Sequence, residues 1–259
     1  MAPLRMISVT LRLGTILIGL LFFAIPIYAS SIFAFRESDG SFSAQPISSA
    51  LENHELVGSF FLTMQIAFGT VLLTLLLLIP TIAYLHFVIP GARAWVEFLT
   101  LTPLVIPPIV QGVGFLYSMP TSLKSTPHAL IFAYTVLALP FSYRAIDSAF
   151  SSIDVRTLFN AASSLGANFM TVVSKILIPN VAAGIFAAIF LTIALVLGEF
   201  AYASLLLWDT FPTVLAVAGM SNASTAVALS ILSLIGVWLI LSALSAFNRR
   251  SRGLIVSGV

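Results

Sequence analysis

The sequence predicts an all-α integral membrane protein with about six transmembrane helices. Two observations lead to this prediction. Hydrophobic residues make up 59% of the 259 residues and charged residues only 8%, whereas a soluble domain carries roughly 25% charged residues. The apolar residues are also gathered in runs of about 20, the length that a helix needs to cross a bilayer. The whole chain, residues 1–259, is therefore expected to form a single transmembrane domain.

The apolar runs give six candidate spans, at residues 12–35, 58–88, 95–118, 127–149, 181–207 and 226–247. The first run is longer than the core of a signal peptide and predicts an uncleaved membrane anchor. The second run contains Pro80, which predicts a tilt, a kink or a helical end that leaves the membrane. Because six crossings return the chain to its starting side, both termini are expected on the same side.

The basic residues predict which side that is, because short cytoplasmic loops carry an excess of lysine and arginine. Only Arg36 and Lys124 fall on one side of the predicted spans. The basic residues at or near the other side are Arg5, Arg12, Arg93, Arg144, Arg156, Lys175, Arg249, Arg250 and Arg252. Both termini and the loop at 150–180 are therefore expected in the cytoplasm, and the segments 36–56 and 208–225 outside. Topology accounts for the positive charge, so we expect membrane lipid, and no nucleic acid, as a partner.

The loop at 150–180 contains two predicted short helices with a glycine between them. Asp154 stands where a helix N-cap belongs, and Gly166 where a left-handed C-cap belongs. Apolar residues at helical spacing give the first helix one apolar face, formed by Val155, Leu158, Phe159, Ala162 and Leu165. A helix this short is expected to dock on another surface. The alternative is an amphipathic helix that lies on the membrane.

The pattern of Ala161-Ala162, Gly166, Ile176 and Pro179 resembles the EAA loop of type I permease subunits of bacterial ABC importers. The resemblance runs from about residue 130 to about residue 215. It includes the segments Leu139–Asp147 and Leu197–Phe200. One residue departs from the pattern, since Asn160 stands where the family usually has a glutamate. A carboxamide keeps the hydrogen bonding of that position and loses its charge.

The resemblance implies a non-catalytic permease subunit in the bacterial cytoplasmic membrane. In that family the short helix of the loop sits in a groove of an ATPase subunit and transmits its closure to the membrane helices. The residues implied to couple to the ATPase are Asp154, Leu158, Phe159, Asn160, Ala161, Ala162, Leu165 and Gly166. The chain itself would need no cofactor, because the partner ATPase binds ATP.

The same resemblance implies three kinds of protein partner and a class of cargo. The partners are a dimer of ATPase subunits, a second permease subunit and a periplasmic or lipid-anchored substrate-binding protein. The neutral Asn160 favours a heterodimer of permeases over a homodimer, because a partner could keep the usual motif. Polyamines come first as cargo, followed by ferric iron, phosphonate, and sulfate or molybdate.

Glu199 is the carboxylate expected inside the membrane, in the outer half of the fifth span. A buried charge in hydrocarbon is costly unless it faces a partner or a watery cavity. Glu199 is therefore expected to line the route, to hold a periplasmic gate closed or to neutralise a helix N-terminus from another span, and the alternative is a structural glutamate. The adjacent Gly198 would permit close approach of a helix or of substrate.

The third predicted span contains three prolines and two glycines between Pro103 and Gly114. Backbone bonds lost at membrane depth must be replaced by protein or by a water-lined cavity. The segment therefore predicts a broken helix around Pro107, at a pathway or hinge, with Gln111 facing the route. The alternative is a kinked helix that only packs.

Other functions have weaker support in the sequence. The chain has no phosphate-binding loop, so its energy must come from a partner ATPase or from an ion gradient. An ion-driven carrier would use Glu199 as its coupling site. An intramembrane enzyme would need clustered polar residues, and a metal site is not expected from His54, His86 and His128, which lack paired spacing. We expect Glu97 and Asp147 to pair with Arg93 or Arg144, or to extend towards the membrane surface.

Overall fold

The computed structural model describes the backbone of residues 2–36 and 41–256, and the side chains of residues 11–36, 41–49, 51–239 and 242. Glu37 and Asp39, two predicted external charges, lie outside the described residues. So do the side chains of Arg5, Arg249, Arg250 and Arg252. Within the described ranges the chain is helical, with one isolated β-bridge between Arg36 and Phe42.

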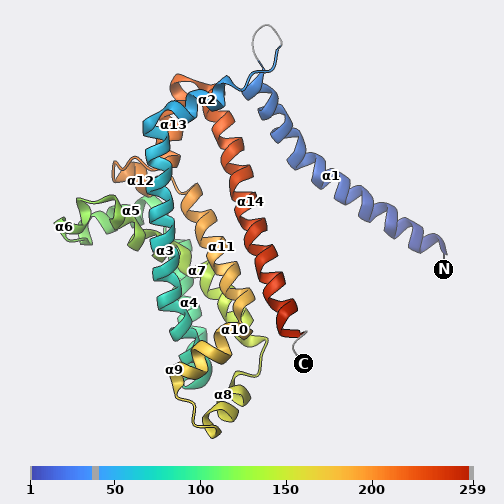
Figure 1. The fold of residues 1–259 in the computed structure, drawn as a ribbon, viewed down its shortest axis with the longest axis vertical. Coiled ribbons are helices and arrows are strands. Elements are labelled where there is room, and N and C mark those ends of the chain that lie inside the picture. The colour runs from blue at the N-terminus through green and yellow to red at the C-terminus, as the bar shows by residue number, and fades with distance from the viewer. Residues whose placement is uncertain (1, 37–40, 257–259) are drawn as a thin grey trace. The chain divides into compact units, whose positions relative to one another are not determined.

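The helices follow one another along the chain, as the colours of Figure 1 show. Their bounds are α1 (Ala2–Phe35), α2 (Gln45–Glu52), α3 (His54–Phe87), the 3-10 turn η1 (Pro90–Ala92), α4 (Arg93–Val105), α5 (Pro108–Ser118), α6 (Thr121–Lys124), the 3-10 turn η2 (Pro127–Ala129), α7 (Leu130–Ser151), α8 (Val155–Ser164), α9 (Phe169–Val172), the π-helical turn η3 (Val173–Leu177), α10 (Ile178–Asn180), α11 (Ala182–Gly198), α12 (Ala201–Leu205), α13 (Phe211–Ser221) and α14 (Ala223–Val256).

Three described helical segments are long and apolar enough to cross a membrane: Leu11–Phe35, His54–Phe87 and Pro127–Ser151. They confirm the first, second and fourth predicted spans. Pro80 does not end α3, which runs for 34 residues and is about 51 Å long at 1.5 Å per residue. It therefore exceeds a hydrocarbon core of roughly 30 Å and must tilt or extend beyond it.

The third predicted span is a broken helix, and the fifth has a bend at its start, before α11. Pro90–Val105 and Pro108–Ser118 meet at an angle of 102°, and Phe169–Asn180 and Ala182–Gly198 at 77°. If each bent pair is one span, the described residues hold up to five. The sixth predicted span lies in α14, whose described apolar part is Ala223–Leu239. The 181–207 span is corrected, because α11 ends at Gly198 and a separate short helix, α12, follows.

The chain divides into two compact units. Unit 1 comprises Met1–Val57 and Leu215–Trp238, and unit 2 comprises Gly58–Val214 and Leu239–Val259. That the whole chain forms one transmembrane domain stays a prediction.

The centre of unit 2 is the contact between α7 and α11, which depends on small residues. A Cβ added at Gly184 would lie 2.5 Å from the Cβ of Ala149 and 2.6 Å from the carbonyl oxygen of Ala145. Further along the same contact, the buried hydroxyls of Ser142 and Thr192 lie 3.0 Å apart. Small residues and hydroxyls are what holds helices together where apolar burial gives no advantage over lipid. The pair forms a closely packed base for the loop that joins the two helices.

Candidate functional site

Helix α8 has a cap at each end, as the sequence predicts. The carboxylate of Asp154 accepts hydrogen bonds from the Thr157 N–H at 3.1 Å and the Thr157 hydroxyl at 2.8 Å. At the other end Gly166 has a φ of +81°, a conformation that glycine adopts without strain. The N–H of Gly166 bonds to the carbonyl of Ser163, and that of Ala167 to the carbonyl of Ala162. This pair of bonds is the Schellman motif.

One face of α8 packs on the rest of unit 2, and this face has fewer residues than predicted. Val155 and Ala162 are buried, and Leu158 and Phe159 are half-buried. Leu165 does not belong to this face. It occupies the C-cap rather than the helix, and 89% of it is exposed. The prediction failed there because the last turn gives way to the glycine cap, where the helical spacing no longer applies.

The packed face of α8 meets aromatic rings from two other helices. The ring centroid of Phe159 lies 4.5 Å from that of Phe87, at the end of α3, and 6.5 Å from that of Phe169, in α9. Phe87 and Phe169 are 6.3 Å apart. We call these three residues the aromatic cluster. It connects α8 directly to the end of a long membrane helix, and Figure 1 shows α8 and α9 together at one end of unit 2.

The opposite face of α8 is exposed. It carries Asn160 and Ala161, the first two residues of the loop motif, together with Arg156 and Ser163. The Asn160 backbone carbonyl accepts a bond from the Ser164 hydroxyl. No bond from the Asn160 carboxamide to a described residue is seen, so this side chain is available to another surface.

A cluster of charged and polar side chains lies next to the aromatic cluster and joins α3, α4 and α7. Nε of Arg93 donates to Oδ1 of Asp147 at 2.8 Å, and Nη2 donates to Oδ2 at 2.6 Å. Nε2 of His86 lies 2.9 Å from the same Oδ1, and Arg93 also bonds to Ser151. We call His86, Arg93, Asp147 and Ser151 the charged cluster. The predicted pairing of Asp147 is confirmed.

The second predicted pair is weaker. Nη2 of Arg144 lies 3.4 Å from Oε1 of Glu97, and 67% and 38% of the two side chains are exposed. By contrast, only 11% of the Asp147 side chain is exposed. His86 also packs on Phe150, with ring centroids 5.5 Å apart. From the sequence His86 was predicted not to bind a metal, and its contact with Asp147 was not foreseen. A signal that could have indicated this contact is the position of His86 at the end of a long apolar run, beside Phe87 and four residues before Pro90.

The broken helix predicted around Pro107 is present, with the bend between α4 and α5. Gln111 is bonded within the protein on both sides of its carboxamide. Nε2 donates to the carbonyls of Pro103 and Ile106, each at 2.6 Å, and Oε1 accepts from the Tyr202 hydroxyl at 3.0 Å. That Gln111 faces a transport route stays a prediction.

Glu199 lies in the break between α11 and α12, not within a continuous span. Its carboxylate accepts from the backbone N–H of Tyr202, at 3.1 Å to Oε1 and 3.2 Å to Oε2. Glu199 therefore lies at a helix N-terminus, as one of the predicted alternatives has it. The helix is α12, the next one in the chain, and not a helix of another span. A Cβ added at Gly198 would meet no described atom within 4 Å, so no described helix packs closely on it. That Gly198 permits close approach of a substrate or of a partner helix stays a prediction.

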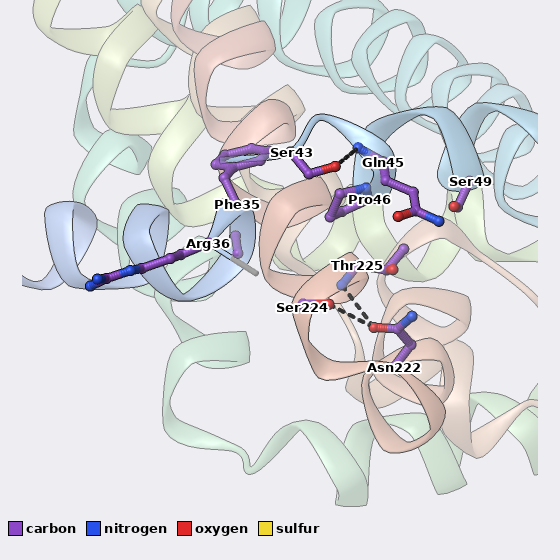
Figure 2. Close-up of a pocket in the computed structure, with 10 residues that line it drawn as sticks. Phe35, Arg36, Ser43, Gln45, Pro46, Ser49, Asn222, Ser224 and Thr225 are labelled. Atoms are coloured by element: carbon purple, nitrogen blue, oxygen red, sulfur yellow. Dashed lines mark hydrogen bonds between the residues drawn. The ribbon is translucent and has the colours of Figure 1, made fainter. Parts of the chain in front are cut away.

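Unit 1 contains a small pocket lined mostly by polar residues, drawn in Figure 2. It lies where the end of α1, the start of α2 and the start of α14 meet, between two segments predicted to be external. The Ser43 hydroxyl accepts from the Gln45 N–H, and the Asn222 carboxamide oxygen accepts from the Ser224 hydroxyl and the Thr225 N–H. The lining residues are Ala34, Phe35, Arg36, Ser43, Gln45, Pro46, Ser49, Asn222, Ser224 and Thr225.

The sequence of this chain is similar to those of known proteins. Residues 90–253 match the family described as binding-protein-dependent transport system inner membrane component. The match covers well over half of the chain. It includes α8, the α7 residues Asp147 and Ser151 of the charged cluster, and the breaks at Pro107 and Glu199. A probable molybdenum ABC transporter permease protein of Haloferax volcanii is 28% identical over 208 residues, which are 74% of this chain and 71% of that protein. The chain therefore belongs to the inner membrane components of binding-protein-dependent transport systems, the permease subunits of ABC importers.

Proposed function

We propose that this chain is the permease subunit of an importer for an oxyanion of the molybdate class. The observation that carries the proposal is the relative in Haloferax volcanii, whose printed name is that of a molybdenum transporter. Polyamine cargo, which the sequence ranked first, becomes the second candidate. A free intramembrane carboxylate would suit a polycation, but the Glu199 carboxylate is already bonded to the start of α12.

The proposed coupling to ATP runs through α8. Its exposed face, with Asn160 and Ala161, would dock on an ATPase subunit, and its packed face would pass the motion to Phe87 and thus to α3. The caps at Asp154 and Gly166 support this role, because a short helix transmits a push only if its ends do not fray. The permease itself takes no part in ATP hydrolysis in this proposal.

The remaining partners follow from the same proposal. A second permease subunit would complete the pathway, and the neutral Asn160 favours a different subunit over a second copy. A substrate-binding protein would deliver the cargo to the outer side, where we place the segments around the unit 1 pocket. The α8 loop and both termini would then lie in the cytoplasm.

Transport by the whole complex tests the cargo. The tagged chain is purified in mild detergent with its co-purifying ATPase, permease and binding protein, and reconstituted into vesicles. We expect ATP-dependent uptake of molybdate that excess tungstate or sulfate inhibits and spermidine does not. Uptake of spermidine in place of molybdate would overturn the cargo. A chain that purifies alone and transports on an ion gradient without ATP would overturn the importer and favour a carrier coupled through Glu199.

Substitution of Gly166 tests the coupling. Gly166→Asp places a Cβ and a charge at a φ of +81°, a conformation that aspartate adopts less readily than glycine. We expect insertion into the membrane to be intact and ATP-driven uptake to fall at least tenfold. The matched control is Ser174→Asp, an exposed residue of the same loop with a helical backbone. Unchanged uptake in Gly166→Asp would contradict the proposed role of α8.

A further inference from the structure

The bend between α4 and α5 leaves backbone carbonyls that the helix itself cannot bond. Pro107 has no N–H, so the carbonyl of Pro103, four residues earlier, loses its helical donor. The turn of 102° also interrupts the bonding of the Ile106 carbonyl. Unpaired carbonyls are costly at membrane depth. The side chain of Gln111 replaces both donors, since its Nε2 lies 2.6 Å from each oxygen.

The other half of the same carboxamide reaches the break between α11 and α12. Oε1 of Gln111 accepts from the hydroxyl of Tyr202, whose own N–H is bonded to the Glu199 carboxylate. Side chains of α12 also pack on the backbone of α5 here, because a Cβ added at Gly112 would lie 2.6 Å from Cδ2 of Leu205 and 3.7 Å from Cδ1 of Tyr202. One chain of hydrogen bonds therefore runs from Pro103 in α4 to Glu199 after α11.

We propose that the Gln111–Tyr202 hydrogen bond is a latch, with Gln111 as its positioning residue. It makes the break between α4 and α5 and the break between α11 and α12 change conformation together. A carboxamide is planar, so its donor and acceptor ends cannot move independently. Any change in the bend that moves the Pro103 and Ile106 carbonyls also moves Oε1. Tyr202 must then follow, and α12 with it, or the bond must break. The proposal rests on the proposed ATP-driven function, because ATP would drive the change.

Tyr202→Phe removes the latch with the least other damage. Only 2% of Tyr202 is exposed, and phenylalanine keeps its ring against Gly112 and Tyr134, whose ring centroid lies 6.3 Å away. We expect the complex to assemble normally and the cargo transported per ATP hydrolysed to fall about tenfold, the scale of one lost buried hydrogen bond. The control is Tyr117→Phe, in α5, where 83% of the residue is exposed and no described residue bonds the hydroxyl.

A second measurement follows the two breaks separately. The chain has no cysteine, so Gly114→Cys in α5 and Ser204→Cys in α12 each introduce a unique thiol. A Cβ at Gly114 meets no described atom within 4 Å, so the thiol fits there. The rate of reaction with a maleimide is measured with and without a non-hydrolysable ATP analogue. We expect the two rates to respond together with Tyr202 present, and only one of them to respond after Tyr202→Phe.

The outcomes separate the latch from the proposed function. If Tyr202→Phe transports as well per ATP as Tyr117→Phe, or if both thiols still respond together in it, the latch is wrong. If the unsubstituted complex neither transports nor shows any ATP-dependent change at either thiol, the proposed function fails first. Gln111→Leu, which also frees the two carbonyls, should lower the yield of folded complex; a full yield would contradict the role of Gln111 at the bend.

Discussion

The region around α8 and the region around the two helix breaks are stabilised in different ways. Around α8 the structure uses charge, aromatic rings and two helix caps. Around the breaks it uses one carboxamide, one hydroxyl and one carboxylate, linked in a single chain. Around α8 the charged cluster, the aromatic cluster and the caps are separate sets of contacts, so losing one leaves the others, whereas removing Gln111 or Tyr202 interrupts the whole chain. This difference is what we expect if the region around α8 is rigid and receives the motion of the ATPase, and if the region around the helix breaks changes conformation in response.

The largest effect is expected in the charged cluster. Asp147→Asn leaves Arg93 and His86 without their counter-charge in a site where little of the aspartate is exposed. Breaking a buried pair on one side costs about 3–5 kcal/mol, and because 37% of the Arg93 side chain is exposed we expect about 3 kcal/mol. Thermal unfolding of the purified complex in detergent measures this loss.

Glu97→Gln is the matched comparison for Asp147→Asn. It removes the same charge from a more exposed pair, where ion pairs contribute about 0–1 kcal/mol. We expect a shift in the unfolding temperature close to zero. Equal shifts for the two variants would mean that the charged cluster does not hold α3, α4 and α7 together, and the contrast between the two regions would be lost.

The next effect is a clash between α7 and α11. Gly184→Ala forces a Cβ to within 2.6 Å of the backbone carbonyl of Ala145, and overpacking of this kind costs typically 1–3 kcal/mol. We expect about 2 kcal/mol, together with less folded complex in the membrane. Gly198→Ala, where the added Cβ has open space, should be near neutral. A strong defect in Gly198→Ala would instead indicate a partner or substrate at that glycine.

The sequence predicted α8 well because its signals are local. An N-cap and its N–H are three residues apart, at Asp154 and Thr157, and the glycine stop is read from one residue. The break at Pro107 was predictable for the same reason, since proline removes a donor wherever it stands. The position where a helix ends is predicted less well. Leu165 was assigned to the apolar face of α8 by its spacing, but the helix ends before it.

Contacts over long sequence separations were outside the reach of these signals. Gln111 and Tyr202 are 91 residues apart, and nothing in either local sequence selects the other. Tyr202 and the aromatic partners Phe87 and Phe169 were missed for this reason. Glu199 was singled out as a costly carboxylate, and a helix N-terminus was among its predicted partners. Which helix supplies that N-terminus could not be foreseen from an unbroken apolar run.

A smaller effect is expected in the aromatic cluster. Phe159→Ala removes a half-buried ring that meets Phe87 at 4.5 Å and Phe169 at 6.5 Å. Full burial would make this change cost about 3–5 kcal/mol, so we expect about 1.5 kcal/mol, confined to α8. Hydrogen exchange of residues 155–164 should become faster while α7 and α11 are unchanged. Leu165→Ala, at the exposed C-cap, should leave exchange in α8 as it was.

The smallest effect concerns the first turn of α8. The hydrogen bonds from Thr157 hold the pKa of Asp154 below its ordinary value, so its charged form stabilises the folded cap. That contribution is complete above the ordinary pKa of about 3.9 and is lost as the pH falls through the lower, folded value. Exchange protection at Thr157 should therefore stay constant from neutral pH down to about pH 5 and fall only in stronger acid.

Two variants distinguish the cap from the charge of Asp154. Asp154→Ala should lose protection at Thr157 at every pH, because no side-chain oxygen remains to accept its N–H. Asp154→Asn should keep protection and lose the acid dependence, since a carboxamide caps about as well and does not titrate. If Asp154→Ala were as protected as the unsubstituted chain, the packed face of α8 alone would fix its first turn. The cap would then add nothing to the rigidity on which the coupling role of α8 depends.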